Sequence, residues 1–194
     1  LTPTVPVGDF NVLELFRGPT SAFKDVALSM LPQLLTAAKT TKGMEKDILK
    51  IAVIERHKNT RHIGIGYIKG YGLKGGAVAT SISHDSHNII VVGANEADMA
   101  AAVNRVVENR GGIVVVKNGE VLGEVALPIA GIMSDDSLEN VNEALENAKA
   151  QAMALGVNEG IDPFMTLSFM ALPVIPTLRI TTRGVIDVIS QQYT

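Results

Sequence analysis

Short runs of aliphatic and β-branched residues, divided by glycines and polar residues, fill the chain from Lys50 to Gly93 and constrain its fold more than any other feature. Each run has the length of one β-strand, and the residues between the runs favour turns. The runs read KIAVIERH, HIGIGYIKGYG, GAVATSIS and NIIVVG. This spacing predicts four strands that belong to one sheet.

Two amphipathic helices and a hairpin are expected after these runs. Asn95 can cap a helix that ends at Gly111-Gly112, and a second helix is expected to follow Ser134 and to close at Gly156. The apolar positions of the first helix recur at helical spacing: Met99, Ala102, Val103, Val106 and Val107. Between the helices, IVVVKNGEVLGEV predicts a hairpin, because Asn118-Gly119 can take the positive φ angles of a type I′ turn.

The fold class that follows is α/β, or α+β, with a β-sheet sandwich and two helices that cover one sheet face. A helical N-terminal appendage precedes it, with an extended entry and then a helix over 23–39 that is interrupted or kinked near Pro32. The apolar faces predict a buried core at Val53, Ile65, Val78, Ile90, Val92, Val103, Val115, Leu145 and Leu172.

Composition excludes several classes of protein. The chain of 194 residues has no cysteine, which rules out disulfides, thiolate metal sites and a cysteine nucleophile and fits a reducing cytoplasm. Its basic residues are scattered and its net charge is −3, so we expect no nucleic-acid partner. The apolar runs are far shorter than a membrane helix needs, so we expect a cytoplasmic protein with no membrane contact. A homo-oligomer is possible.

The most polar short segment is the quintet His84, Asp85, Ser86, His87 and Asn88, which precedes the run NIIVVG. Two interpretations are open. The quintet is a candidate catalytic or metal site, or it is a polar turn in which side chains satisfy local backbone groups. Residues three apart on an extended strand point to opposite faces, so the two histidines converge on one ion only if the chain turns between them. We therefore predict no metal ligands in this chain and keep the quintet as a candidate polar site.

From about Lys50 to the carboxyl end, the chain resembles the C-terminal domain of adenine deaminase. The resemblance rests on AVIERHKNT, IGIGYIKGYGLKGGAVATSISHDSHNIIVVGANEADMAAAVN, GGIVVV, LPIAGIMSD and PFMTLSFMALPVIPTLRITTRG. It implies an amidohydrolase in which water activated by a divalent metal converts adenine to hypoxanthine and ammonia. The metal ligands belong to the amino-terminal barrel of that family, so we expect no cofactor and no adenine turnover for this chain alone.

Residues 1–49 resemble a different family, threonine synthase, through LELFRGPTSAFKDVALSMLPQLLTAA and KGMEKDIL. By this resemblance Lys24 matches the lysine that forms a Schiff base with pyridoxal phosphate (PLP). Arg17 stands where that family has histidine, and the segment ends before a glycine-rich phosphate loop. The alternative for Lys24 is a solvated lysine on a helix. On this interpretation the chain is a chimera of a 1–49 fragment and a 50–194 domain.

Three functions follow. The first is a non-catalytic domain of an adenine deaminase that packs on the barrel, supports subunit contacts or lends the quintet to the active-site mouth. The second is a PLP-dependent threonine synthase fragment that uses Lys24. The third is an independent assembly module. The first is preferred because its motifs are long and occur in order along most of the chain.

Overall fold

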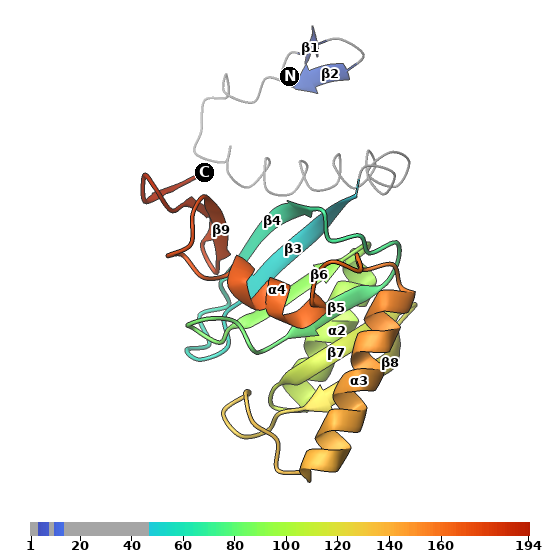
Figure 1. Ribbon diagram of the computed structural model, residues 1–194. Coiled ribbons are helices and arrows are strands. Elements are labelled where there is room, and N and C mark those ends of the chain that lie inside the picture. The colour runs from blue at the N-terminus through green and yellow to red at the C-terminus, as the bar shows by residue number, and fades with distance from the viewer. Residues whose placement is uncertain (1–3, 8–9, 14–46) are drawn as a thin grey trace. The chain divides into compact units, whose positions relative to one another are not determined.

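The computed structural model describes residues 4–7, 10–13 and 47–194, and the chain divides into two compact units, Leu1–Gly43 and Met44–Thr194. In the first unit β1 (Thr4–Val7) and β2 (Phe10–Leu13) pair antiparallel (Figure 1), which agrees with the extended start expected from the sequence. The helix expected over 23–39 lies outside the described residues.

The second unit is built on one antiparallel sheet of six strands. Four of them come from the runs that predicted one sheet, and the predicted hairpin supplies the other two. Its order is β4-β3-β6-β5-β7-β8, and every neighbouring pair is antiparallel. The strands are β3 (Ile48–Ile54), β4 (Ile63–Lys69), β5 (Ala77–Thr80), β6 (Ile89–Gly93), β7 (Gly112–Lys117) and β8 (Glu120–Ala126). In β5, β6 and most of β7 every residue is buried, so both faces of the sheet centre are covered.

The two long helices lie on opposite faces of this sheet, so the expectation that they cover one face was wrong (Figure 1). Helix α2 (Glu96–Glu108) packs on Ala79, Val91 and Val114, whereas α3 (Leu138–Ala154) shares a core with Val115 and Val125. The physical reason is that the central strands are apolar at consecutive positions, so each face needs its own cover. The result is a layer of sheet between two helical layers.

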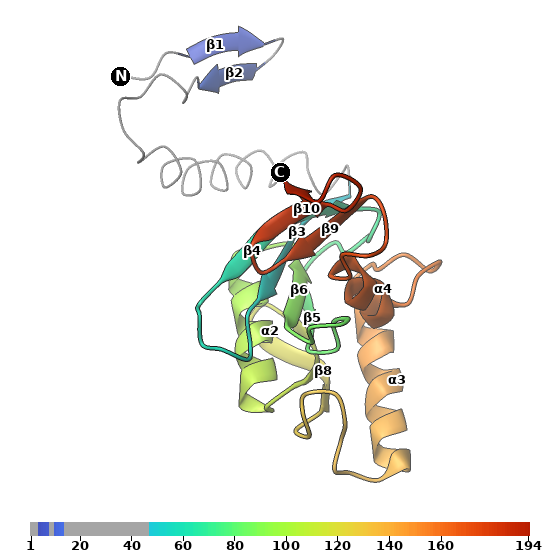
Figure 2. The same ribbon diagram turned by 90° about the vertical axis from the view of Figure 1, so that its left-hand side faces the viewer.

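Two elements at the carboxyl end add to the layer that contains α3. Helix α4 (Pro163–Met170) begins at the N-cap Asp162, whose carboxylate accepts hydrogen bonds from the N–H groups of Phe164 and Met165. A three-stranded sheet of β9 (Leu178–Thr181), β10 (Gly184–Asp187) and β11 (Gln192–Tyr193) follows and lies against β4 (Figure 2). A Cβ at Gly64 of β4 would collide with the carbonyl of Thr181, so this close approach requires glycine.

The core prediction is confirmed at Val53, Val78, Ile90, Val92 and Val115, which are all buried. Three further positions are half-buried, namely Val103, Leu145 and Leu172. Ile65 was wrongly placed in the core, because β4 is an edge strand and Ile65 lies on the face where α2 packs over β5, β6 and β7 instead. Its side chain is 48% exposed.

The local capping and turn signals were accurate to within a few residues. Asn95 caps α2 through a hydrogen bond from the N–H of Asp98 to its side-chain oxygen at 2.8 Å. Asn118 and Gly119 have φ angles of 53° and 80°, which confirms the positive φ pair of the hairpin. The second helix starts later than expected, because Ser137 rather than Ser134 caps α3.

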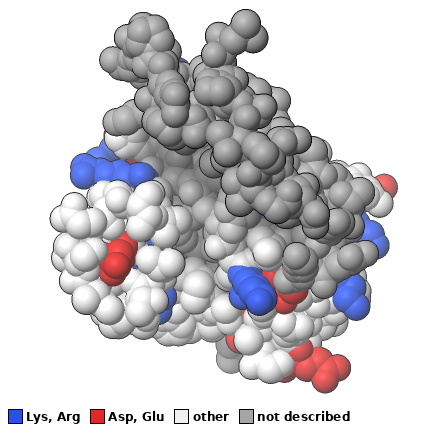
Figure 3. All heavy atoms as spheres, turned by 90° about the horizontal axis from the view of Figure 1, so that it is seen from above, with Lys and Arg blue, Asp and Glu red and all other residues white. Residues whose placement is uncertain are grey.

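Among the described residues, no helix has the length and apolar character needed to cross a membrane. On the described surface in Figure 3, basic and acidic side chains lie scattered among uncharged ones.

Candidate functional site

The quintet forms the turn between β5 and β6 at one end of the main sheet. His87 has a φ angle of 48°, and its backbone N–H donates to the carbonyl of Ser83 at 2.6 Å. Asp85 and Ser86 are exposed at the tip, whereas Asn88 is buried where β6 begins. The chain therefore does turn between the two histidines.

Arg56, which follows β3, holds the quintet in place. Its Nε donates to the carbonyl of His87 at 2.8 Å, and its backbone N–H donates to Oδ1 of Asn88 at 3.1 Å. Its Nη2 donates to the carbonyl of Ala130, in the loop between β8 and α3, at 2.8 Å. One side chain thus joins three segments that are far apart in the sequence. Partial burial lowers the pKa of the Arg56 guanidinium, which still carries its charge at neutral pH.

The loop between β3 and β4 adds a second contact to the quintet. Glu55 accepts hydrogen bonds from the N–H groups of His57, Lys58 and Thr60, at 2.5, 2.6 and 3.0 Å. These bonds, led by that from Thr60, hold the pKa of the Glu55 carboxyl at about 2. The ordered loop brings Nε2 of His57 to within 2.6 Å of the carbonyl of Ser86. His57 is exposed, but it contacts the quintet.

The two histidines of the quintet have different environments. His87 accepts a hydrogen bond at Nδ1 from the N–H of Ser83 at 3.3 Å, which requires its neutral ring. Burial, followed by the nearby His84 and Arg56, lowers the pKa of His87. The ring of His84 stacks on Phe169 of α4 and meets the His87 ring edge-on, with 5.5 Å between ring centroids in both pairs.

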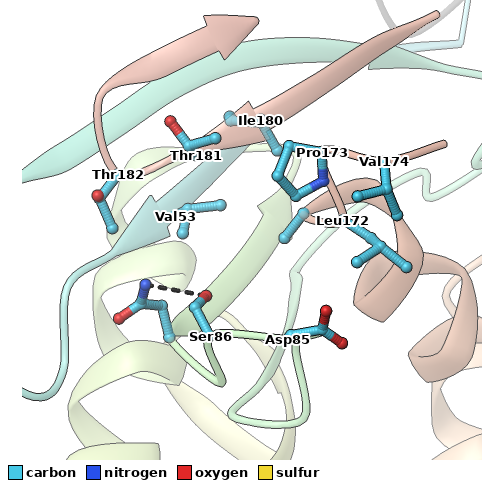
Figure 4. Close-up of a pocket in the computed structure, with 11 residues that line it drawn as sticks. Val53, Asp85, Ser86, Leu172, Pro173, Val174, Ile180, Thr181 and Thr182 are labelled. Atoms are coloured by element: carbon cyan, nitrogen blue, oxygen red, sulfur yellow. Dashed lines mark hydrogen bonds between the residues drawn. The ribbon is translucent and has the colours of Figure 1, made fainter. Parts of the chain in front are cut away.

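A cavity of about 330 Å³ opens beside the quintet (Figure 4). Asp85, Ser86 and Asn88 line one side, and Asn88 Nδ2 donates to Ser86 Oγ at 3.1 Å. Thr181 and Thr182 lie across from them, at the end of β9. The remaining lining is mostly apolar and comes from Val53, Ala171, Leu172, Pro173, Val174 and Ile180. Apolar walls with a few polar groups are typical of a site for a small organic molecule.

The described residues do not fit a metal centre. Within 47–194, no three histidine, aspartate or glutamate side chains come together as possible metal ligands. Nδ1 of His87 already accepts a backbone hydrogen bond, and Asp85 Oδ1 lies 4.0 Å from Nδ1 of His84. No catalytic step through a metal can be derived from these residues.

Sequence reasoning found the quintet but missed the residues that complete the site. Arg56, Thr181 and Thr182 come from segments 25 or more residues away from the quintet. The only sequence signal for Arg56 was its place directly after an apolar strand. Lys24, the residue matched to a PLP lysine, lies outside the described residues.

The chain matches the family model described as "Adenine deaminase C-terminal domain" over residues 31–192. It is 54% identical over 149 residues to an adenine deaminase of Bacillus subtilis, which covers 77% of this chain and 26% of that protein. It is 48% identical over 170 residues to an adenine deaminase of Bacillus licheniformis, a match that covers 84% of this chain and 30% of that protein. An adenine deaminase of Brucella melitensis is 53% identical over 146 residues, a match that covers 75% of this chain and 25% of that protein.

Two facts follow from these matches. The chain spans only about a quarter to a third of the length of these relatives. The family match starts at residue 31, so it includes residues 31–49 of the segment that resembles threonine synthase. The matches give no support to the threonine synthase resemblance, nor to PLP as a cofactor.

Proposed function

Because this chain belongs to the adenine deaminase C-terminal domain family, we propose that it is the carboxyl-terminal part of an enzyme that converts adenine and water to hypoxanthine and ammonia. The match over residues 31–192 carries this proposal, together with about 50% identity to proteins named adenine deaminase. The catalytic chemistry then belongs to the complete enzyme, of which this chain is a portion, and the isolated chain does not turn over adenine.

The quintet serves in the complete enzyme as a polar edge of the active-site mouth. The support is geometric: Asp85, Ser86 and Asn88 line a cavity. From a separate loop, Arg56 and His57 contact the side chain of Asn88 and the backbone carbonyls of His87 and Ser86. Fixed polar groups are what a site needs to orient a small polar substrate. The divalent metal of the complete enzyme binds outside the described residues, since these offer no ligand cluster.

The test uses a full-length protein that carries this domain. Adenine turnover is followed by ammonia release, and bound metal is measured on the same samples. His84→Ala and His87→Ala should lower turnover by about tenfold or more, the usual scale for loss of a positioning group, and should leave metal content unchanged. His62→Ala is the matched control, because the ring of His62 is exposed and makes no hydrogen bond among the described residues. It should retain full activity.

Three results would contradict the proposal. An intact full-length protein that does not deaminate adenine refutes the function itself. Loss of stoichiometric metal in the His84 or His87 variant shows that the quintet is a metal site. Full activity in both variants shows that the quintet is only a structural turn.

A further inference from the structure

The quintet is surrounded by exposed apolar side chains that have no role in the core of the second unit. We name these residues the apolar rim: Ile129, Ile132 and Met133 from the loop between β8 and α3, Met165 and Phe169 from α4, and Val174 after it. Their side chains are between 37% and 69% exposed. Exposed apolar side chains that gather around polar groups mark interaction surfaces more often than isolated ones do.

Contacts place the rim around the quintet. Arg56 joins the carbonyl of His87 to that of Ala130, so the loop that carries Ile129 lies beside the quintet. On the other side, the ring of His84 stacks on Phe169. Val174 and Asp85 line the same cavity (Figure 4). The rim and the quintet therefore form one continuous face.

The rim loop is held in a fixed conformation. Ser81 Oγ is buried and donates to the carbonyl of Gly131 at 2.6 Å. Ile129 and Met133 exchange two backbone hydrogen bonds, each of 3.1 Å. A Cβ at Gly131 would collide with the guanidinium of Arg56, so the two groups are closely packed. Apolar side chains on such a loop can bind a partner with little further loss of conformational entropy.

We infer that the apolar rim is the surface on which this domain docks against the remainder of its own enzyme. This inference rests on the proposed function. The family is a C-terminal domain, and the chain spans 26% of its relative from Bacillus subtilis, so a much larger body of protein belongs to the same chain there. The partner surface is apolar where it meets the rim, and it closes the open side of the quintet cavity. Docking at this face brings the quintet to the mouth of the active site in the remainder of the enzyme.

A second exposed apolar group does not fit this role. Ile63, Ile65 and Tyr67 lie along the edge strand β4, on the sheet face that carries α2. They line no cavity with the quintet, and Lys50 and Glu96 form an ion pair near them. Ile65 is 48% exposed and Met133 is 53% exposed, which makes Ile65 a matched control for the rim.

The experiment uses thiol labelling, for which this chain is well suited because it has no cysteine. Met133→Cys and Ile65→Cys are made in the 194-residue chain and in a full-length protein that carries this domain. Labelling at each position is read by mass spectrometry of its peptide. In the 194-residue chain both positions should label at similar rates. In the full-length protein the Met133→Cys site should slow by on the order of tenfold or more, as expected for a packed interface, while the Ile65→Cys site stays fast.

Each other outcome overturns the inference. Unchanged labelling at position 133 in the full-length protein shows that the rim stays open. Equal protection at both positions, or protection at position 65 alone, places the interface elsewhere. Protection at position 133 that grows with concentration in the 194-residue chain assigns the rim to a second copy of this chain. Adenine turnover of the unlabelled full-length protein is measured separately, so protection without turnover refutes the proposed function and leaves the docking surface standing.

Discussion

At the scale of single residues, the candidate site is supported by Arg56, which lies outside the quintet. Its guanidinium donates to two backbone carbonyls, those of His87 and Ala130, which belong to different loops. Every residue has a backbone carbonyl, so the residue types in a sequence do not show which carbonyls accept a side-chain hydrogen bond. For this reason the quintet could be recognised from the sequence as five adjacent polar residues, whereas its support by Arg56 could not.

Replacing Arg56 tests this support. Arg56→Met keeps much of the aliphatic packing but leaves both carbonyls without their donor, so the free energy of unfolding should fall by about 2 kcal/mol. Urea unfolding of the 194-residue chain measures the change. Arg183→Met is the control, because the side chain of Arg183 is exposed and makes no hydrogen bond among the described residues. A loss of the same size in both variants would show that the hydrogen bonds of Arg56 do not specifically stabilise the fold.

His87 should make stability depend on pH. Its pKa is lowered in the fold by burial, with His84, Arg56 and His57 acting in the same direction and Asp85 opposing them. The folded state therefore favours the neutral ring, so its contribution is present above the unfolded pKa near 6.5 and is lost as pH falls below that value. Between about pH 6.5 and pH 5, the free energy of unfolding should fall more steeply for the wild type than for His87→Asn. Parallel curves for the two proteins would contradict this assignment.

At the scale of elements, strands and caps were predictable because their signals are local. The runs of β-branched residues, the Asn95 cap and the Asn118-Gly119 turn each act within a few positions of the chain. The helix α4 was missed because PFMTLSFM is almost wholly apolar and shows no helical period. Which sheet face each helix covers depends on the path of the chain, although the unbroken apolar runs of β6 and β7 already indicated two covered faces.

The hairpin between β7 and β8 gives a prediction about backbone conformation alone. Gly119 has a φ angle of 80°, and a Cβ placed there would meet no atom within 4 Å. Gly119→Val should therefore lower the free energy of unfolding by about 1–2 kcal/mol through backbone strain and not through a clash. Thermal unfolding should show a melting temperature lower by a few degrees. Gly160→Val, at an open site without a positive φ, is the control, and an equal shift there would refute the turn assignment.

At the scale of the whole molecule, the two buried clusters of the second unit lie entirely between Leu49 and Ile180. The sequence resemblance placed the boundary at residue 50, the compact unit begins at Met44, and the family match begins at residue 31. The compact unit and the family match both include every member of the two clusters, whereas a boundary at residue 50 cuts strand β3 and leaves out Leu49, which is fully buried. A limit at residue 44 or 31 therefore keeps the core complete, and a limit at residue 50 removes one of its members.

A truncated chain of residues 44–194 should accordingly fold with the same cooperativity as residues 31–194. We expect free energies of unfolding that agree within about 1 kcal/mol, because neither truncation removes a member of the buried clusters. Guanidinium unfolding of both fragments, followed by circular dichroism, measures this. A fragment 44–194 that fails to unfold cooperatively, while 31–194 does so, would show that residues 31–43 belong to the folding unit.

The central strands are buried on both faces in the folded protein, so their apolar side chains are exposed while the chain is still being synthesised. Helix α3, which covers one face of the sheet, ends at Ala154, whereas β7 ends at Lys117. Strand β7 therefore leaves the ribosome before the helix that covers it has been synthesised. At bacterial and eukaryotic elongation rates this interval lasts roughly 2 to 7 s, and during it an aliphatic β-sheet face is open to other nascent chains. Glu120 on the edge strand β8 is exposed and places negative charge where another strand would add, whereas the carboxylate of Glu124 is paired with Arg105 of α2. Chaperone dependence of expression should therefore rise when Glu120 is made neutral by Glu120→Gln.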